Sequence, residues 1–473
     1  ISELRFGSNS FNSLQQLNIS NCSKLTSVID LFKNRAGYPN LNRNFLANCT
    51  SLTTVEGLFE NSILTTLPNQ MFFNSNKIQS LKRCFKNCNY LMTIPSGILD
   101  SMPELVDITE VFYGSKLQRY EDIIELDENG TEQVVGKKVL NVFQTDNLFY
   151  NCPKLRVATS AFENSELINV PINLFTNSTL INTIDYCFKG IQNPLSEYDG
   201  ERKTLIVPDN LFVNLPYVNS INEAFMNTFM GNINDNIFSS VPKIINANNL
   251  FNGSSLGRIP INIFQNAPLL ESLEGTFASY NLSEIPENFL NNVPKLNNVL
   301  NIFKNSKITN LPIGFLYNNN ITKFKFSDLG IPGLLAVNSD ILGCNKLIDI
   351  TNLFSNVAIE SVPNNLFSTN SNISICLNLF TDSNIKSIGD NFLLNNSITT
   401  INSLAIGNVL LESIGNGFMK NSPFLVNADY SFQNSSISYI GNEFMKNCQN
   451  LTSCISMFRN STLQEFGYEF MRN

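Results

Sequence analysis

The 473-residue sequence contains neither histidine nor tryptophan, and only 15% of its residues are charged. Histidine is the side chain most often used for general acid–base catalysis, so its absence removes the commonest catalytic base. We also find no glycine-rich phosphate loop, no G-x-S-x-G motif and no metal-ligand spacing. The sequence therefore predicts a protein that is not an enzyme and binds no cofactor. A glycosidase with two carboxylates drawn from different turns is the one catalytic alternative.

Basic residues are few and dispersed. The chain has 31 Lys and Arg against 39 Asp and Glu, for a net charge of -8, and no basic stripe of the kind that follows a phosphate backbone. No segment approaches the roughly 20 consecutive apolar residues of a membrane span. Hydrophobic residues still make up 43% of the chain, which is enough to form a core. We therefore expect a folded protein that binds no nucleic acid and inserts no part of this chain into a membrane.

Ten cysteines are present, and several follow asparagine at a position where other turns carry serine. Interchange with serine predicts buried free thiols in a slot for a small side chain, in preference to a disulfide framework. A zinc site without histidine would need four thiolates from different turns, so we expect no metal. The cysteines of this slot are Cys22, Cys49, Cys88, Cys152 and Cys448.

The most informative feature is a repeat marked by phenylalanine, of which there are 37. Two half-units alternate, one reading L-x-x-I-P-x-x-x-F and the other L-x-x-[IVL]-x-x-x-F followed by x-N-S or x-N-C. The full unit is about 26 residues, inside the range of leucine-rich repeats. The spacing of about 13 residues is clearest at Phe251, Phe264, Phe277, Phe289, Phe303 and Phe315.

Each half-unit is too short to fold alone, so its apolar residues must be buried against neighbouring copies. Stacking at about 4.8 Å would pair the backbones of successive turns and place Phe on Phe. We therefore predict one leucine-rich-repeat-type solenoid over residues 1–473. It is a β-rich, right-handed superhelix with turns of about 26 residues, made of short strands plus turns or short helices.

Corner residues of the repeat are also in phase. Proline follows Ile at Pro260 and Pro286 and ends the strand there, because it has no N–H to donate, and glycine replaces it at Gly415 and Gly441. The asparagine after Phe, as at Asn61, is expected to bond the turn backbone of its own and the neighbouring coil. A ladder of ligands for a bound partner is the alternative interpretation.

The pattern F-x-N-[SC]-x-L-x-x-I-P-x-x-x-F is visible at Phe162–Phe175 (FENSELINVPINLF) and Phe354–Phe367 (FSNVAIESVPNNLF). It is similar to the BspA-like leucine-rich repeats of bacterial and protist surface proteins, over nearly the whole chain. Here the unit is longer and carries Phe in both halves. The resemblance implies an extracellular or cell-surface protein that acts in adhesion and in host or matrix binding.

Two insertions interrupt the repeat. Residues 118–143 contain two β-rich runs around Asn129-Gly130, a strong hairpin signal, and residues 190–204 contain a second probable turn at Asp199-Gly200. Both follow the same kind of half-unit, so we expect them to emerge from one side as a paired protrusion. Tolerated surface loops are the alternative. The predicted partner-binding residues are Tyr120, Glu121, Glu128, Asn129, Lys137, Lys138, Tyr198 and Arg202.

These features predict a non-catalytic, surface-exposed binding or adhesion protein that uses an extended solenoid surface and its protruding insertions. The expected partners are a protein or glycan on a host cell or matrix, or other copies of the chain. The alternative is a structural subunit of a larger assembly, such as a phage virion appendage or an extracellular filament, located on the virion or cell surface.

Overall fold

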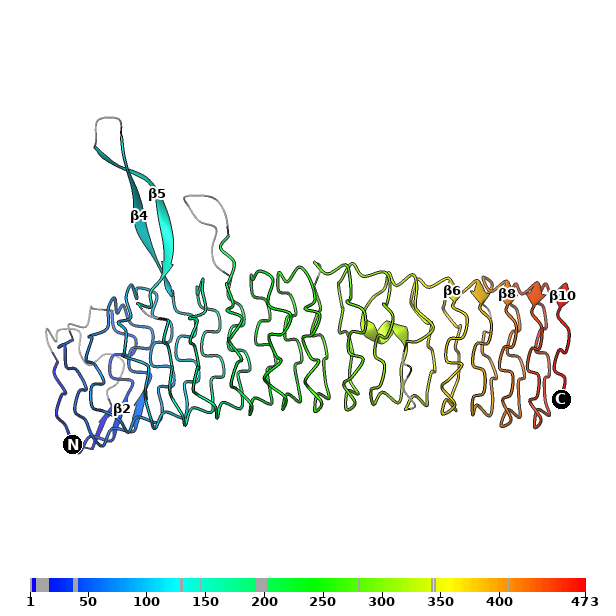
Figure 1. Ribbon diagram of the computed structural model, residues 1–473, viewed down its shortest axis with the longest axis horizontal. Coiled ribbons are helices and arrows are strands. Elements are labelled where there is room, and N and C mark those ends of the chain that lie inside the picture. The colour runs from blue at the N-terminus through cyan, green and yellow to red at the C-terminus, as the bar shows by residue number, and fades with distance from the viewer. Residues whose placement is uncertain are drawn as a thin grey trace. The chain divides into compact units, whose positions relative to one another are not determined.

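The computed structural model describes residues 2–5, 17–36, 41–127, 131–144, 146–192, 202–279, 281–341, 343, 346–405 and 408–473. The chain divides into two compact units, Ile1–Gly257 and Arg258–Asn473. Each unit is a stack of coils built from the repeat (Figure 1). That the two form one uninterrupted solenoid stays a prediction.

Regular secondary structure is short in both units, except for one hairpin. In unit 1, parallel strands β1 (Glu3–Arg5), β2 (Ser27–Ile29) and β3 (Thr54–Glu56) form one sheet, and antiparallel strands β4 (Gln118–Leu126) and β5 (Glu132–Asn141) form another. Unit 2 contains the 3-10 helix η1 (Phe326–Leu329) and a five-stranded parallel sheet. Its strands are β6 (Ser361–Val362), β7 (Ser387–Ile388), β8 (Ser413–Ile414), β9 (Tyr439–Ile440) and β10 (Glu465–Phe466).

The register of the parallel strands gives the length of a coil. Ser361 pairs with Ser387 and Ser387 with Ser413, so equivalent residues are 26 positions apart. Isolated parallel bridges continue the same pairing elsewhere, as between Asp349 and Ile375. Turns connect the strands, and η1 is the one helix among the described residues. The chain is therefore a leucine-rich-repeat-type solenoid with almost no helix, as the repeat predicts.

Phenylalanine columns form the core. The rings of Phe162 and Phe188, from successive coils, stack with centroids 5.6 Å apart and an interplanar angle of 3°. A second column runs through the other half-unit, where Phe418 and Phe444 stack at 5.2 Å. The columns also touch each other, with Phe418 edge-on to Phe432 at 5.8 Å. All five rings are buried, so the hydrophobic interior continues from coil to coil.

Asparagine occupies the corners because the backbone there is left-handed. Asn61 and Asn87 have φ values of 56° and 55°, a region that asparagine tolerates better than most residues. Their amides bond each other along the stack: Asn87 Nδ2 donates to Asn61 Oδ1, and Asn61 Nδ2 donates to Asn34 Oδ1, both at 2.7 Å. The expected bonds from this column to the turn backbone are therefore replaced by amide–amide bonds between coils.

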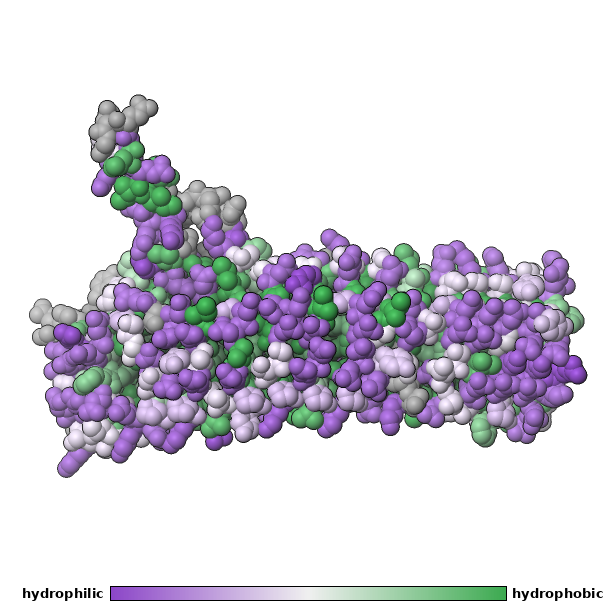
Figure 2. Space-filling view, viewed as in Figure 1, coloured by the Kyte–Doolittle hydropathy of each residue, from purple (hydrophilic) through white to green (hydrophobic). Residues whose placement is uncertain are grey.

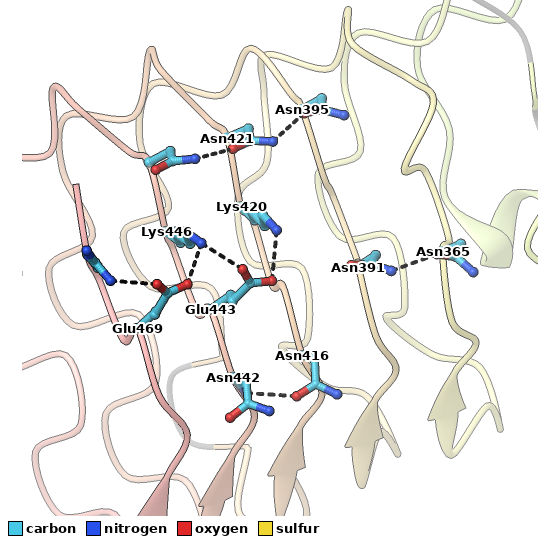
Figure 3. A network of polar contacts seen from close by, with 12 residues as sticks. Asn365, Asn391, Asn395, Asn416, Lys420, Asn421, Asn442, Glu443, Lys446 and Glu469 are labelled. Carbon is cyan, nitrogen blue, oxygen red and sulfur yellow. Dashed lines mark hydrogen bonds and ion pairs between the residues drawn. The ribbon is translucent and has the colours of Figure 1, made fainter.

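Side chains bond the neighbouring backbone in a different column, which lies just after β7 to β9. The backbone N–H of Asn416 donates to Asp390 Oδ1 at 2.7 Å. The backbone N–H of Asn442 donates to Asn416 Oδ1 at 2.8 Å (Figure 3). Each polar side chain in this column thus satisfies a backbone donor of the next coil.

Replacement of proline by glycine explains where the longest parallel sheet forms. The N–H groups of Gly389, Gly415 and Gly441 donate to the carbonyls of Val362, Ile388 and Ile414 at 2.7–2.9 Å. Proline at this position has no N–H and cannot make this bond. Coils with glycine therefore continue the ladder from β6, which is itself followed by Pro363, through β7 to β10. At the other described corners with proline there is at most an isolated bridge, as between Thr66 and Thr93.

Substitution of Gly441 tests how closely the backbones of successive coils approach at this corner. A Cβ there would lie 2.6 Å from the backbone N of Asn416, whereas one at Gly333, also in unit 2, would meet nothing within 4 Å. We expect Gly441→Ala to destabilise the protein by about 1–3 kcal/mol through overpacking and to lower its thermal unfolding midpoint, measured by circular dichroism. Gly333→Ala should leave the midpoint unchanged or slightly raised. Equal midpoints for the two variants would contradict this account of the corner.

Candidate interaction surface

The hairpin β4–β5 projects from the coils of unit 1 and is rooted in their core (Figure 1). β4 begins just after Leu117 and β5 ends just before Val142, and both of these side chains are fully buried. Val142 N–H donates to Leu117 O at 3.1 Å, and Ile94 N–H donates to Val142 O at 2.8 Å. The two ends of the hairpin are thus held at a fixed position on the coils.

Polar side chains add to this root and connect it to the second insertion. Asn141 Nδ2 donates to Asn169 O at 2.8 Å, and Asn169 N–H donates back to Asn141 Oδ1 at 3.3 Å. Asn169 also forms a parallel bridge with Ile206, which follows the second insertion. The roots of both insertions therefore lie on one edge of unit 1.

Two of the predicted binding residues lie on β4 close to the root. Tyr120 is half-buried, with the Lys116 ammonium 5.6 Å from its ring centroid. Glu121 is exposed and forms an ion pair with Arg119. Both side chains have partners within the hairpin base, where they help to hold the ribbon.

The two predicted lysines lie opposite these residues on β5. Lys138 pairs across the ribbon with Glu121, and Lys137 pairs with Asp122. Lys137 Nζ lies 3.7 Å from Asp122 Oδ1, a weak and exposed ion pair. The structure thus brings Tyr120, Glu121, Lys137 and Lys138 together on one ribbon.

The other four predicted binding residues do not lie on the described part of this ribbon. Glu128, Asn129 and Tyr198 fall outside the described residues, as do the predicted turns at Asn129-Gly130 and Asp199-Gly200. Arg202 is exposed, and its guanidinium lies 5.4 Å from the ring centroid of Phe229. This contact places Arg202 at the root of the second insertion.

Our sequence reasoning missed an aliphatic cluster on the outer half of the hairpin. Ile124 lies directly opposite Val134, and Leu126 lies two residues further along on the same face. Their side chains are 54%, 61% and 68% exposed, respectively, and apolar residues gather on this part of the ribbon in Figure 2. The sequence does contain a signal for this cluster: it predicts a two-stranded insertion, and such an insertion has no second layer to cover aliphatic side chains. The predicted binding residues are instead aromatic or charged, apart from the amide Asn129.

Charged side chains elsewhere form alternating columns along the coils. In unit 2, Glu443 accepts hydrogen bonds from Lys420 and Lys446, each at 2.8 Å, and Lys446 also contacts Glu469 (Figure 3). The bond from Lys420, followed by that from Lys446, lowers the pKa of Glu443 to about 2. Unit 1 has similar pairs, such as Lys189 with Glu223 at 2.7 Å. These columns neutralise their own charge and therefore stabilise the stack without presenting a charged site.

Cavities open between coils at one corner of the repeat. In unit 1, a cavity of about 350 Å³ lies where Ile98 replaces the usual Phe, and it is lined by Gln70, Asn74, Asp100 and the exposed Phe73. Burial raises the pKa of Asp100. Unit 2 has a smaller cavity of about 230 Å³ between residues 261–265 and 287–293.

No cluster of potential metal ligands occurs in the described parts of the chain. No helix in those parts has the length and apolar character needed to cross a bilayer.

The cysteines of the serine slot serve packing and hydrogen bonding. Cys88 is buried, its Sγ donates to Phe59 O at 3.2 Å, and its N–H donates to Ser115 Oγ at 3.0 Å, where Ser115 fills the same slot one coil later. Burial raises the pKa of Cys88 and of Cys152 to about 12. The described cysteines have free thiols, and four of the slot are buried as the interchange with serine predicts: Cys49, Cys88, Cys152 and Cys448. For Cys22 the predicted burial is wrong, because its side chain is exposed.

The chain has little sequence similarity to known proteins. No protein-family model matches the chain, and no curated protein shows significant similarity to it. Among solved structures, the plant peptide hormone receptor RGFR1 in complex with RGF2 has 12% identity and a TM-score of 0.34, with 96% of this chain and 72% of the receptor covered.

Two further solved structures match this chain with similarly low identity and TM-score. The Drosophila Toll–Spatzle complex has 14% identity and a TM-score of 0.34, with 94% of this chain and 55% of the other covered. The leucine-rich repeat domain of APL1 has 18% identity and a TM-score of 0.20, with 56% and 64% covered. This chain thus spans less than two thirds of the Toll and APL1 chains.

Thiol labelling tests the burial of the cysteine slot. A thiol of ordinary pKa, about 8.5, reacts readily with iodoacetamide at pH 8, whereas a buried thiol with a pKa of about 12 does not. We expect rapid labelling of the exposed Cys22 and at least tenfold slower labelling of Cys88 and Cys152, measured by peptide mass spectrometry. All three should react in concentrated urea. Labelling of Cys88 as fast as Cys22 in the native protein would show that the slot is open.

Removal of the central carboxylate tests the charged column. Because the folded-state pKa of Glu443 is about 2, below the ordinary value of about 4.3, its stabilising effect is present above pH 4.3 and is lost as the pH falls towards 2. We expect Glu443→Gln to lower the thermal midpoint by about 2 °C at pH 7, and the difference from wild type to vanish near pH 2.

Glu465 in β10 provides the control, because it forms no ion pair with any described residue. Glu465→Gln should leave the midpoint unchanged at both pH values. A Glu443→Gln effect of equal size at pH 7 and pH 2 would be inconsistent with the ion-pair explanation.

Proposed function

We propose that the chain is a non-catalytic, protein-binding solenoid that recognises its partner through the hairpin β4–β5 and the adjoining edge of unit 1. The supporting observation is the firmly rooted ribbon with exposed aliphatic side chains at Ile124, Leu126 and Val134. A two-stranded ribbon is marginally stable by itself, and exposed aliphatic clusters typically mark interaction sites. The solenoid serves as the rigid support.

We further propose that this binding takes place outside the cell or at its surface, in adhesion to a protein or glycan of a host cell or matrix. The resemblance of the FENSELINVPINLF pattern to BspA-like repeats supports this setting. Absence of histidine supports a role without catalysis. Tyr120, Glu121, Lys137 and Lys138 would then act mainly by holding the ribbon, and the aliphatic cluster would make the contact.

Removal of the hairpin tests this function. Gln118 and Asn141 are cross-strand partners, so an Asn-Gly turn can join them while the root bonds of Asn141 and Val142 are kept. We expect the shortened chain to lose binding to the host-protein or glycan targets that the intact chain retains on an array, by at least tenfold in Kd. Its thermal midpoint should stay unchanged.

The outcome that contradicts the proposal is undiminished binding by the shortened chain. Light scattering coupled to size-exclusion chromatography should show both chains as monomers. Growth of the intact chain into ordered multimers with rising concentration would instead favour the assembly-subunit role.

A further inference from the structure

The two edges of the hairpin differ in regularity. Ile123 pairs with Gly136 and Ile124 pairs with Val134, so Val135 is an extra residue that makes a bulge on β5. A bulge bends its strand and interrupts the spacing of its backbone groups. β4 has no extra residue over its nine positions, and β5 is its only strand partner among the described residues. The outer edge of β4 is therefore a regular row of backbone donors and acceptors that another strand can pair with.

The two faces of β4 have different chemistry. Ile124 and Leu126 lie on one face beside Val134, and all three are more than half exposed. On the outer half of β4, Glu125 lies on the opposite face together with Ile123, because successive side chains alternate along a strand. A strand added to this part of the edge would thus meet the aliphatic pair Ile124 and Leu126 on one face and the Glu125 carboxylate beside Ile123 on the other.

Charge on this part of the hairpin has one sign. From Ile123 to Gly136, beyond the base where Lys137 and Lys138 lie opposite Asp122 and Glu121, the sequence contains four acidic residues and no basic residue. Glu125 and Glu132 form no ion pair with any residue that the structure describes. Like charges disfavour pairing with a second copy of the same hairpin and contact with an anionic lipid surface. A cationic partner is favoured.

We propose that the edge of β4 accepts an extended segment of a partner protein as a third strand, and that this segment alternates aliphatic with Lys or Arg residues. Aliphatic side chains of the segment pack beside Ile124 and Leu126, and a cation on its other face lies beside Glu125. This inference rests on the proposed function and specifies the chemistry of the partner. Backbone pairing supplies affinity, and the alternation supplies specificity.

The test uses the intact chain and a fluorescein-labelled peptide of seven alternating valine and lysine residues. We expect saturable binding by fluorescence anisotropy, weakened at least tenfold by Glu125→Lys. The matched control is Glu412→Lys, which changes the net charge equally at an exposed carboxylate of unit 2 and should bind like wild type. Equal binding by the two variants would overturn the inference.

A second measurement does not depend on folding of the variants. The same peptide carrying N-methyl groups on alternate backbone amides keeps its charge but cannot pair along one edge, so its binding to the wild-type chain should be lost. Retained binding would mean that the attraction is only electrostatic, which also overturns strand pairing. If the shortened chain loses its array targets while the peptide does not bind wild type, the proposed function stands and the strand-pairing inference is wrong. If the shortened chain keeps its targets, the proposed function itself is wrong.

Discussion

Stacking each residue on its equivalent in the preceding coil, 26 positions earlier between β6, β7 and β8, is the constraint on which the rest of the structure depends. Whatever side chain a coil carries must be compatible with nearly the same side chain one strand spacing away. Phenylalanine meets this demand through offset stacking, as between Phe162 and Phe188. Asparagine meets it because an amide both donates and accepts, so that Asn61 and Asn87 continue a chain of bonds.

Charged residues cannot obey the same rule, since identical charges in successive coils repel. The column in unit 2 alternates in sign instead, with Glu443 between Lys420 and Lys446. The Glu443 carboxylate is shared by two ammonium groups, which explains why its pKa falls to about 2 although the column is near the surface. The low overall content of charged residues follows from this restriction.

The repeat and the hairpin were accessible from the sequence because both depend on local patterns. Phe spacing gave the coil length, and Asn129-Gly130 between β-rich runs indicated strands where β4 and β5 lie. The amide–amide hydrogen bonds could not be predicted from the sequence, because they depend on the left-handed backbone at the corner and on the alignment of Asn61 with Asn87 in successive coils. The aliphatic cluster was overlooked for another reason: the burial of Ile124 depends on which layers surround it, and a strand pattern alone does not reveal that no layer does.

A solenoid that satisfies its own polar groups from coil to coil leaves little for a partner to bind. Asp390 accepts from the N–H of Asn416, and Glu443 is occupied by two lysines. The hairpin differs, because among the described residues β4 has a strand neighbour on one side only and exposes aliphatic side chains that a third strand would cover. Its base is fixed by Leu117, Val142 and Asn141, so the edge is presented in one orientation. If the proposed pairing takes place there, it would require little ordering of the solenoid, because the edge is already held in place.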